Sequence, residues 1–131
     1  MRHNQSLFDL ADWLTEPPAG GPLQMWTVGA GLASIVTGYG LLCCLTQQAT
    51  TLNVTLRGFQ PLGRGMWVEI TGVHAVTFGV VIACLGLFIH FQWFWGNHKR
   101  LFRFHAVCKY ATVVALLVAI VGHVFAMITR T

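Results

Sequence analysis

The chain has 131 residues, of which 55% are hydrophobic and only 9% are charged, and its net charge is +4. A soluble domain carries about 25% charged residues, so this composition excludes an ordinary soluble fold and indicates one membrane domain spanning residues 1–131. The positive balance comes from few acids rather than many bases. Without a basic patch interleaved with aromatic residues, nucleic acid is not an expected partner.

The first expected element is a short amphipathic surface helix over residues 6–16. Ser6 can cap it, and the pair Pro17–Pro18 ends it. Four apolar side chains share one face of this helix: Leu7, Leu10, Ala11 and Leu14. Three acidic residues in the same stretch argue against a cleavable signal peptide.

Three apolar segments follow, at about residues 23–45, 70–95 and 104–128. Each is long enough to cross about 30 Å of hydrocarbon, which takes about 20 helical residues. The short connection 96–103 predicts that the last two spans form an antiparallel hairpin. The connection 47–68 is longer and contains glycine and proline, and we expect an ordered loop there. The predicted fold class is therefore an all-α integral membrane protein with three spans.

Basic residues outside the spans predict the orientation. The side that holds the N-terminus and the short connection has four: Arg2, Lys99, Arg100 and Arg103. The opposite side has three: Arg57, Arg64 and Arg130. This difference favours a cytoplasmic N-terminus.

Small residues recur along the first two spans and predict where the helices approach closely. Their positions are Gly29, Ala33 and Thr37 on the first span and Gly72, Gly79 and Gly86 on the second. Helix packing is the favoured interpretation. A groove kept flat for a planar macrocycle is the alternative.

Four histidines lie near the ends of the second and third spans: His74, His90, His105 and His123. Ionisable side chains at membrane depth are costly and usually mark function, and neutral imidazole is the common protein ligand of haem iron. We therefore expect one or two b-type haems. His90 and His105 form the first expected ligand pair, and His74 and His123 the second.

Helical geometry distinguishes these pairs. His105 and His123 are 18 residues apart and share one face, whereas His74 and His90 are 16 apart and lie about 160° from each other around their helix. A single haem between His90 and His105 is thus favoured, with His74 facing the first helix, a second protomer or another subunit. The alternative is that the histidines are interfacial or hydrogen-bonded within the bundle without any cofactor.

Charged residues near these histidines have expected roles as well. Basic side chains at the end of the hairpin that holds the short connection can pair with haem propionates: Lys99, Arg100, Arg103 and Lys109. Arg57 and Arg64 are candidates at the opposite end. Glu69 is expected to start the second helix, where the helix dipole favours a carboxylate.

The third span is predicted to have two different faces. A small and polar stripe carries His105, Cys108, Lys109, Thr112, Ala115, Ala119, His123 and Ala126 and should face protein. The opposite face is apolar and consists of Val114, Leu117, Val118, Val121, Phe125 and Ile128.

The residues from Gly72 to His123 include "GVHAVTFGVVIACLGLFIH" and "KRLFRFHAVCKYATVVALLVAIVGH". This region resembles the histidine-bearing helix hairpins of membrane b-type cytochromes. The resemblance implies electron transfer through haem held by His74, His90, His105 and His123. Those families usually have four or more helices, whereas three are expected here, which makes a second haem doubtful.

A second segment, "RGMWVEITGVHAVTFG", is similar to part of the three-helix L-type subunit of photosystem I. There a glutamate and a histidine five residues later bind chlorophyll, so the resemblance implies that Glu69 and His74 do the same. Here a whole helix precedes the segment, and the spacing before the glutamate is longer.

These observations lead to three functional hypotheses. The favoured one is a haem b electron-transfer subunit, as a small cytochrome or the anchor of a larger oxidoreductase. A chlorophyll-binding accessory subunit and a cofactor-free assembly subunit are the alternatives. Neither a catalytic triad nor a phosphate loop nor a carboxylate pair is present, so catalysis by this chain alone is not expected. The expected partners are the lipid bilayer and either other membrane subunits or further copies of the chain.

Overall fold

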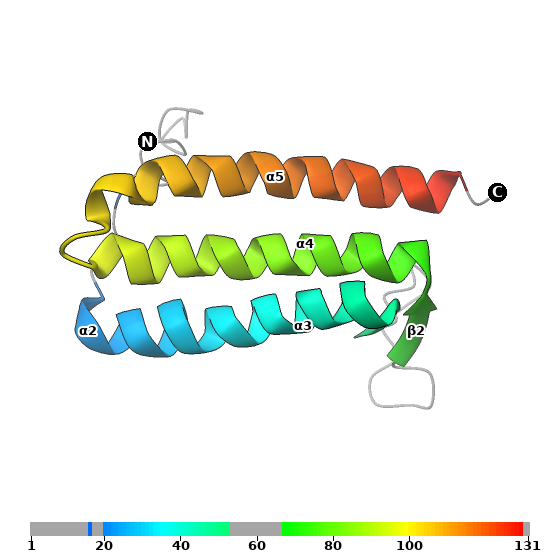
Figure 1. Cartoon of the computed structure of the whole chain (residues 1–131), viewed down its shortest axis with the longest axis horizontal. Helices are drawn as coiled ribbons and strands as arrows, with labels where there is room; N and C mark the ends of the chain where they lie inside the picture. The colour runs from blue at the N-terminus through cyan, green and yellow to red at the C-terminus, as the bar shows by residue number, and fades with distance from the viewer. Residues whose placement is uncertain (1–15, 17–19, 53–66, 130–131) are drawn as a thin grey trace, which may run out of the picture.

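The computed structural model describes residue 16, residues 20–52 and residues 67–129. The surface helix predicted for residues 6–16 lies, except for Glu16, outside the described residues. The same is true of Arg57, Arg64 and Arg130. Most of the described chain forms three long helices (Figure 1).

The first helix is continuous over Gly21–Thr46 and consists of α2 (Gly21–Gln24), η1 (Met25–Leu32) and α3 (Ala33–Thr46). Pro22 lies in its first turn, where the missing backbone N–H costs no intrahelical hydrogen bond. The η1 segment is a π-helix. The helix ends at Gln47, which adopts the left-handed conformation with φ 54°.

The second helix runs over Val73–Trp95 and consists of α4 (Val73–Ile89) and a second π-helical segment, η2 (His90–Trp95). The third helix is α5 (Phe102–Ile128). All three are long and apolar enough to cross a membrane. The predicted fold of three spans is confirmed, and its ends agree with the prediction to within about three residues.

The connection between the first two spans contains a strand pair that the sequence analysis missed. Strand β1 (Gln48–Leu52) pairs with β2 (Trp67–Thr71) in antiparallel register, with Thr50 opposite Glu69. The prediction that Glu69 starts the second helix was therefore wrong, and this helix begins three residues later than the expected start of the span. The β-branched residues at 50, 51, 68, 70 and 71 favour extended backbone, and the helix starts only after Gly72.

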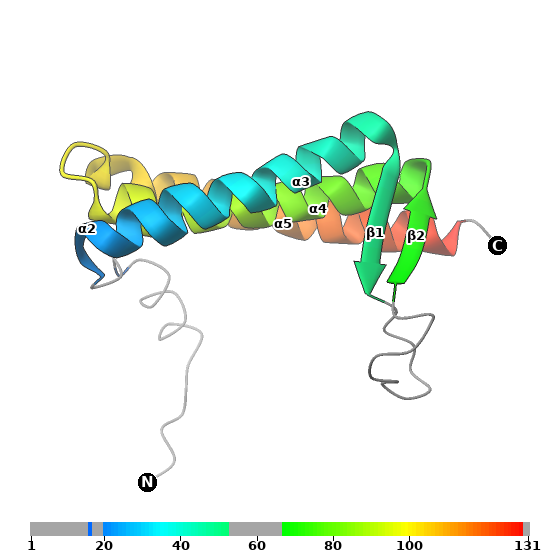
Figure 2. The same ribbon diagram turned by 90° about the horizontal axis from the view of Figure 1, so that it is seen from below.

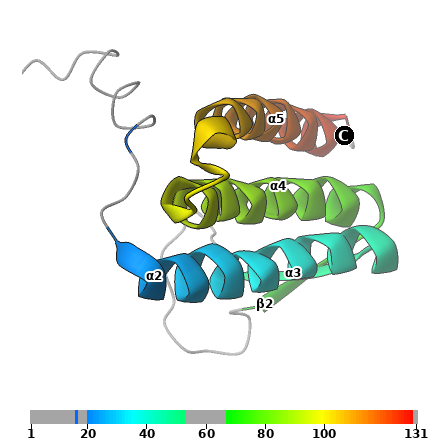
Figure 3. The same cartoon turned by 60° about the vertical axis from the view of Figure 1, so that its left-hand side comes forward.

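The three spans form a flat row with α4 in the middle, packed against α3 on one side and α5 on the other (Figures 1 and 3). The strand pair lies across the end of the row where α4 begins, and the α4–α5 connection lies at the other end (Figure 2). The two ends of the row thus differ in structure, and each of them holds two of the four histidines.

Small residues bring the first two helices together. A Cβ atom added at Gly79 would lie 2.6 Å from the Gly40 carbonyl oxygen, and one at Gly86 would lie 2.6 Å from the Thr37 backbone nitrogen. A Cβ at Gly29 would collide with the backbone of Phe94. The predicted close packing is confirmed for these positions, whereas Gly72 serves the turn before α4 with a φ of 67°.

The two faces of α5 agree with the prediction except at Ala115 of the polar stripe, which is exposed. His105, Lys109 and Thr112 are buried. The residues of the apolar face are exposed: Val114, Leu117, Val118, Val121, Phe125 and Ile128. Since α5 packs along α4 through its polar stripe, its apolar face is left for lipid or another protein.

Candidate functional site

A pocket of about 410 Å³ lies where α4 begins and α5 ends. His74 of α4 and His123 of α5 both line it, together with Met127. Strand β2 supplies the remaining wall through Val68, Glu69, Ile70 and Thr71. The structure thus brings the second predicted histidine pair together in one cavity.

Thr77 fixes the ring of His123. Its Oγ1 lies 2.8 Å from His123 Nδ1 and 3.1 Å from the carbonyl oxygen of His74. A carbonyl oxygen only accepts, so both contacts are satisfied when the Thr77 hydroxyl donates to it and His123 Nδ1–H donates to the hydroxyl. In that tautomer His123 Nε2 keeps its lone pair. A ring held through Nδ1 in this way is the usual arrangement of a metal-ligating histidine.

His74 differs from the other three histidines. Its Nδ1 is buried and has no hydrogen-bond partner. Buried polar atoms are nearly always paired, and an exception calls for a specific explanation. An unpaired buried nitrogen destabilises a protein, so helix packing alone does not explain why a histidine occupies position 74.

His90 joins the second span to the first. Its Nδ1–H donates to the carbonyl oxygen of Gly29, at 2.8 Å. The ring stacks on Phe94, with centroids 5.0 Å apart and planes at 12°. His90 also lines a pocket of about 330 Å³ with residues of α3. This side chain therefore faces the first helix.

His105 is buried at the beginning of α5. Its Nδ1 lies 2.6 Å from the carbonyl oxygen of Phe102 on the same helix, and its ring stacks on Phe102 with centroids 4.7 Å apart. The Nδ1 atoms of His90 and His105 are thus directed to Gly29 and Phe102, respectively. The pair favoured by the sequence analysis is joined by neither of these hydrogen bonds.

The basic residues proposed for propionates near the α4–α5 connection lie far from the His74–His123 pocket, whereas Arg57 and Arg64 lie outside the described residues. Arg100 lines a pocket at the α4–α5 connection, and Arg103 is exposed. Lys109 is buried and donates a hydrogen bond to the side-chain oxygen of Gln92. His105 and His123 are about 27 Å apart along α5 at the standard helical rise, so these cations cannot reach a group bound at the far end.

Two polar residues that contact candidate site residues were missed from the sequence: Thr77 beside His123, and Gln92, which pairs with Lys109 at the opposite end of the row. Thr77 follows His74 by three residues, which places both near one face of a helix. Gln92 is the sole amide inside the second span. An uncharged polar residue within a hydrophobic run is the signal that identifies both, because such groups seek partners between helices.

No protein family, curated protein or solved structure matches this chain. Within residues 16, 20–52 and 67–129, no group of three or more His, Cys, Asp or Glu side chains converges on a point. A tetrapyrrole needs only one or two axial ligands from the protein, and a histidine pair is enough to supply them.

Proposed function

We propose that this protein is a membrane electron-transfer subunit that holds one b-type haem at the end of the bundle where α4 begins. His74 and His123 are the proposed axial ligands. The observation that carries the proposal is that these two imidazoles, from neighbouring spans, line the same pocket. This replaces His90 and His105 as the preferred pair, because His90 faces the first helix, where it lines a pocket with residues of α3, rather than α5.

The residues of the pocket fit such a group in three respects. Thr77 selects the His123 tautomer that leaves Nε2 able to bind iron. His74 carries a buried nitrogen without a partner. The pocket volume of about 410 Å³ falls within the range of about 300–1,000 Å³ that is typical of ligand sites, and it is open at one side, as a large planar group requires.

Bound haem would supply one-electron redox chemistry, and the protein would supply ligands and surroundings. Thr77 would orient His123. The wall formed by β2 would separate the group from water on one side. The potential would depend on the axial ligands and on their hydrogen bonds, so the Thr77–His123 contact is the feature of this chain that would tune it.

We also propose that the N-terminus and the α4–α5 connection face the cytoplasm. Four basic residues on that side against three on the other support this orientation. The proposed haem would then lie toward the opposite membrane surface. Reporter fusions at each terminus and within the connection test it: a reporter active only in the cytoplasm should be active at the N-terminus and inactive at the C-terminus.

The test of the haem proposal is a reduced-minus-oxidised absorption spectrum of the full chain, purified in detergent from a haem-sufficient host. The wild type should show the bands of b-type haem. His74→Ala and His123→Ala should lose them. His90→Ala and His105→Ala are matched controls, since each removes one intramembrane imidazole, and both should keep the signal.

Two results would contradict the proposal. A wild-type protein without absorption in the visible region favours the assembly-subunit hypothesis. The second is full haem content in the His74→Ala/His123→Ala double variant together with its loss in His90→Ala or His105→Ala. That result would show that His90 and His105, at the opposite end of the bundle, bind the haem.

A chlorophyll-binding accessory subunit is the second candidate, because Glu69 and His74 line the same pocket. One axial ligand suffices for that pigment, so His123 would not be needed. Expression in a chlorophyll-producing host separates the two candidates: a red absorption band lost in His74→Ala but kept in His123→Ala supports chlorophyll.

A further inference from the structure

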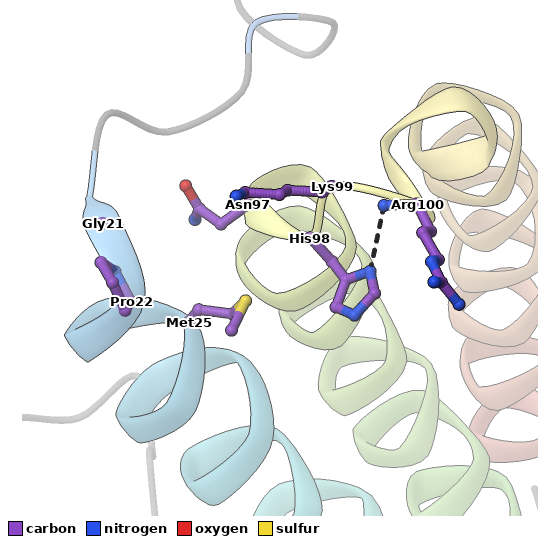
Figure 4. A pocket seen from close by; sticks show the side chains of 7 residues that line it. All are labelled: Gly21, Pro22, Met25, Asn97, His98, Lys99 and Arg100. Atoms are coloured by element: carbon purple, nitrogen blue, oxygen red, sulfur yellow. Dashed lines mark hydrogen bonds between the residues drawn. The ribbon is translucent and has the colours of Figure 1, made fainter.

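A second pocket, of about 620 Å³, lies at the opposite end of the bundle, between the start of the first helix and the α4–α5 connection (Figure 4). Pro22 and Met25 form its apolar side. The connection contributes the polar side through Asn97, His98, Lys99 and Arg100. The pocket thus has cationic groups on one side and hydrocarbon on the other.

The polar side of the pocket is held in shape by its own hydrogen bonds. The Arg100 backbone N–H donates to His98 Nδ1 at 3.3 Å, and Asn97 Nδ2 donates to the Trp93 carbonyl oxygen at 2.8 Å. The His98 ring also stacks on Phe94, with centroids 5.7 Å apart. Two cationic side chains are therefore presented by a compact turn rather than by a long loop.

Their charge is not neutralised within the described part of the chain. The acidic residues described there are Glu16 and Glu69. Glu69 lies in β2 at the other end of the row, and no ion pair joins Glu16 to Lys99 or Arg100. A zwitterionic headgroup would find cations here but no carboxylate for its own ammonium group. An anionic group in this pocket would be attracted by Lys99 and Arg100, and no acidic residue among those that line it would repel the group.

The depth of the pocket restricts the source of that anion. The first span begins at Gly21, the second ends at Trp95 and the third begins at Phe102, so the pocket lies at the level of the lipid headgroups. Clusters of Lys and Arg beside a span attract anionic lipids. The apolar wall of Pro22 and Met25 suits the start of an acyl chain, which a free phosphate ion does not have.

We propose that this pocket binds the headgroup of an anionic phospholipid. Lys99 and Arg100, whose side chains leave the turn in different directions (Figure 4), attract its phosphate through their charge, and Pro22 and Met25 contact the glycerol and upper acyl region. The site is separate from the histidine pocket, and it does not depend on whether the chain binds haem.

The test uses the full chain in detergent, equilibrated with mixed micelles of dioleoylphosphatidylglycerol and dioleoylphosphatidylcholine, and measures the lipid retained by native mass spectrometry. The wild type should retain phosphatidylglycerol selectively. A basic residue near a membrane surface contributes about 1 kcal/mol, so Arg100→Gln should lower this selectivity about fivefold, and Lys99→Gln/Arg100→Gln about 30-fold.

Arg103→Gln is the matched control, since Arg103 is exposed at the same end but does not line the pocket. It should change selectivity by less than twofold, and Arg100→Lys should retain it. Met25→Trp fills the apolar side without changing charge and should also reduce retention.

Three outcomes overturn the proposal. An Arg103→Gln effect equal to that of Arg100→Gln means that diffuse charge attracts the lipid. Unchanged retention in Met25→Trp removes the pocket from the explanation. Complete displacement of the lipid by excess inorganic phosphate assigns the cations to a free anion.

Discussion

Lys109 of the third span donates a hydrogen bond to the side-chain oxygen of Gln92 in the second, and both side chains are buried. A lysine at this depth is costly unless it has a partner. This pair therefore joins α5 to η2 near the end of the row that holds His90 and His105.

The Lys109–Gln92 pair predicts an asymmetric set of variants. Gln92→Leu leaves the lysine without this partner and should destabilise the protein by about 3–5 kcal/mol. Lys109→Met leaves only a neutral amide unpaired and should cost about 1–3 kcal/mol. The double variant should be closer to the wild type than Gln92→Leu alone. Thermal unfolding in detergent, followed by tryptophan fluorescence, measures all three, and simple additivity would contradict the coupling.

The Thr77 hydroxyl predicts an effect on haem affinity without any change of ligand. Thr77→Val removes the acceptor for His123 Nδ1–H and should weaken haem binding about 10- to 100-fold. Thr77→Ser keeps the hydroxyl and should bind normally. Thr112→Val is the control, because that hydroxyl donates only to Cys108 on its own helix, at 2.7 Å. Haem titration of the apoprotein measures these affinities, and equal losses in Thr77→Val and Thr112→Val would argue against a specific role.

The contact between the first two helices predicts that Gly79 does not tolerate a methyl group. A Cβ there would lie 2.6 Å from the Gly40 carbonyl oxygen, so Gly79→Ala should cost about 1–3 kcal/mol through forced separation of the helices. Gly38→Ala adds a methyl group where nothing lies within 4 Å and should be neutral or stabilise by up to about 1 kcal/mol. Equal melting temperatures for the two variants would show that the close approach is absent in solution.

Two residues at the ends of the strand pair, Gln47 before β1 and Gly72 after β2, predict opposite effects. Gly72 has φ 67° and ψ −140°, a conformation that is essentially restricted to glycine, so Gly72→Ala should cost about 1–3 kcal/mol. Gln47 is a non-glycine residue with φ 54°, and Gln47→Gly should relieve about 1–2 kcal/mol of left-handed strain. Because the Gly72 N–H donates to the Gln47 carbonyl oxygen at 2.9 Å, amide exchange across β1 should respond to both changes. Faster exchange in Gln47→Gly would contradict the strain argument.

The sequence predicts the three spans well because hydrophobic length is a property of each segment alone. It fails at residues 67–71, because the charge-free run that continues through the second helix already begins at Ile70, inside the strand. Val68 and Ile70 fit either structure by composition. Gly72 and the pairing with β1 determine that these residues form a strand. This pairing is a contact between residues distant in the sequence, and hydropathy carries no information about it.

The pairing of the histidines was harder to predict. Helical periodicity correctly separates His74 from His90 around α4, but it does not tell which of them faces α5. That choice depends on Gly29, which allows the first helix close enough for its carbonyl oxygen to accept a hydrogen bond from His90. The π-helical turns at residues 25–32 and 90–95 also lie outside a periodicity of 3.6 residues.

The flat arrangement of the helices has a consequence for assembly. A closed bundle leaves no position for another helix, whereas a row can be extended at either edge without disturbing the helices already in place. The outer side of α5 is apolar along its length, so this edge of the row is left for lipid or another helix. In such an assembly α4 would keep its two neighbouring helices, and a further helix would pack only against the outer face of α5.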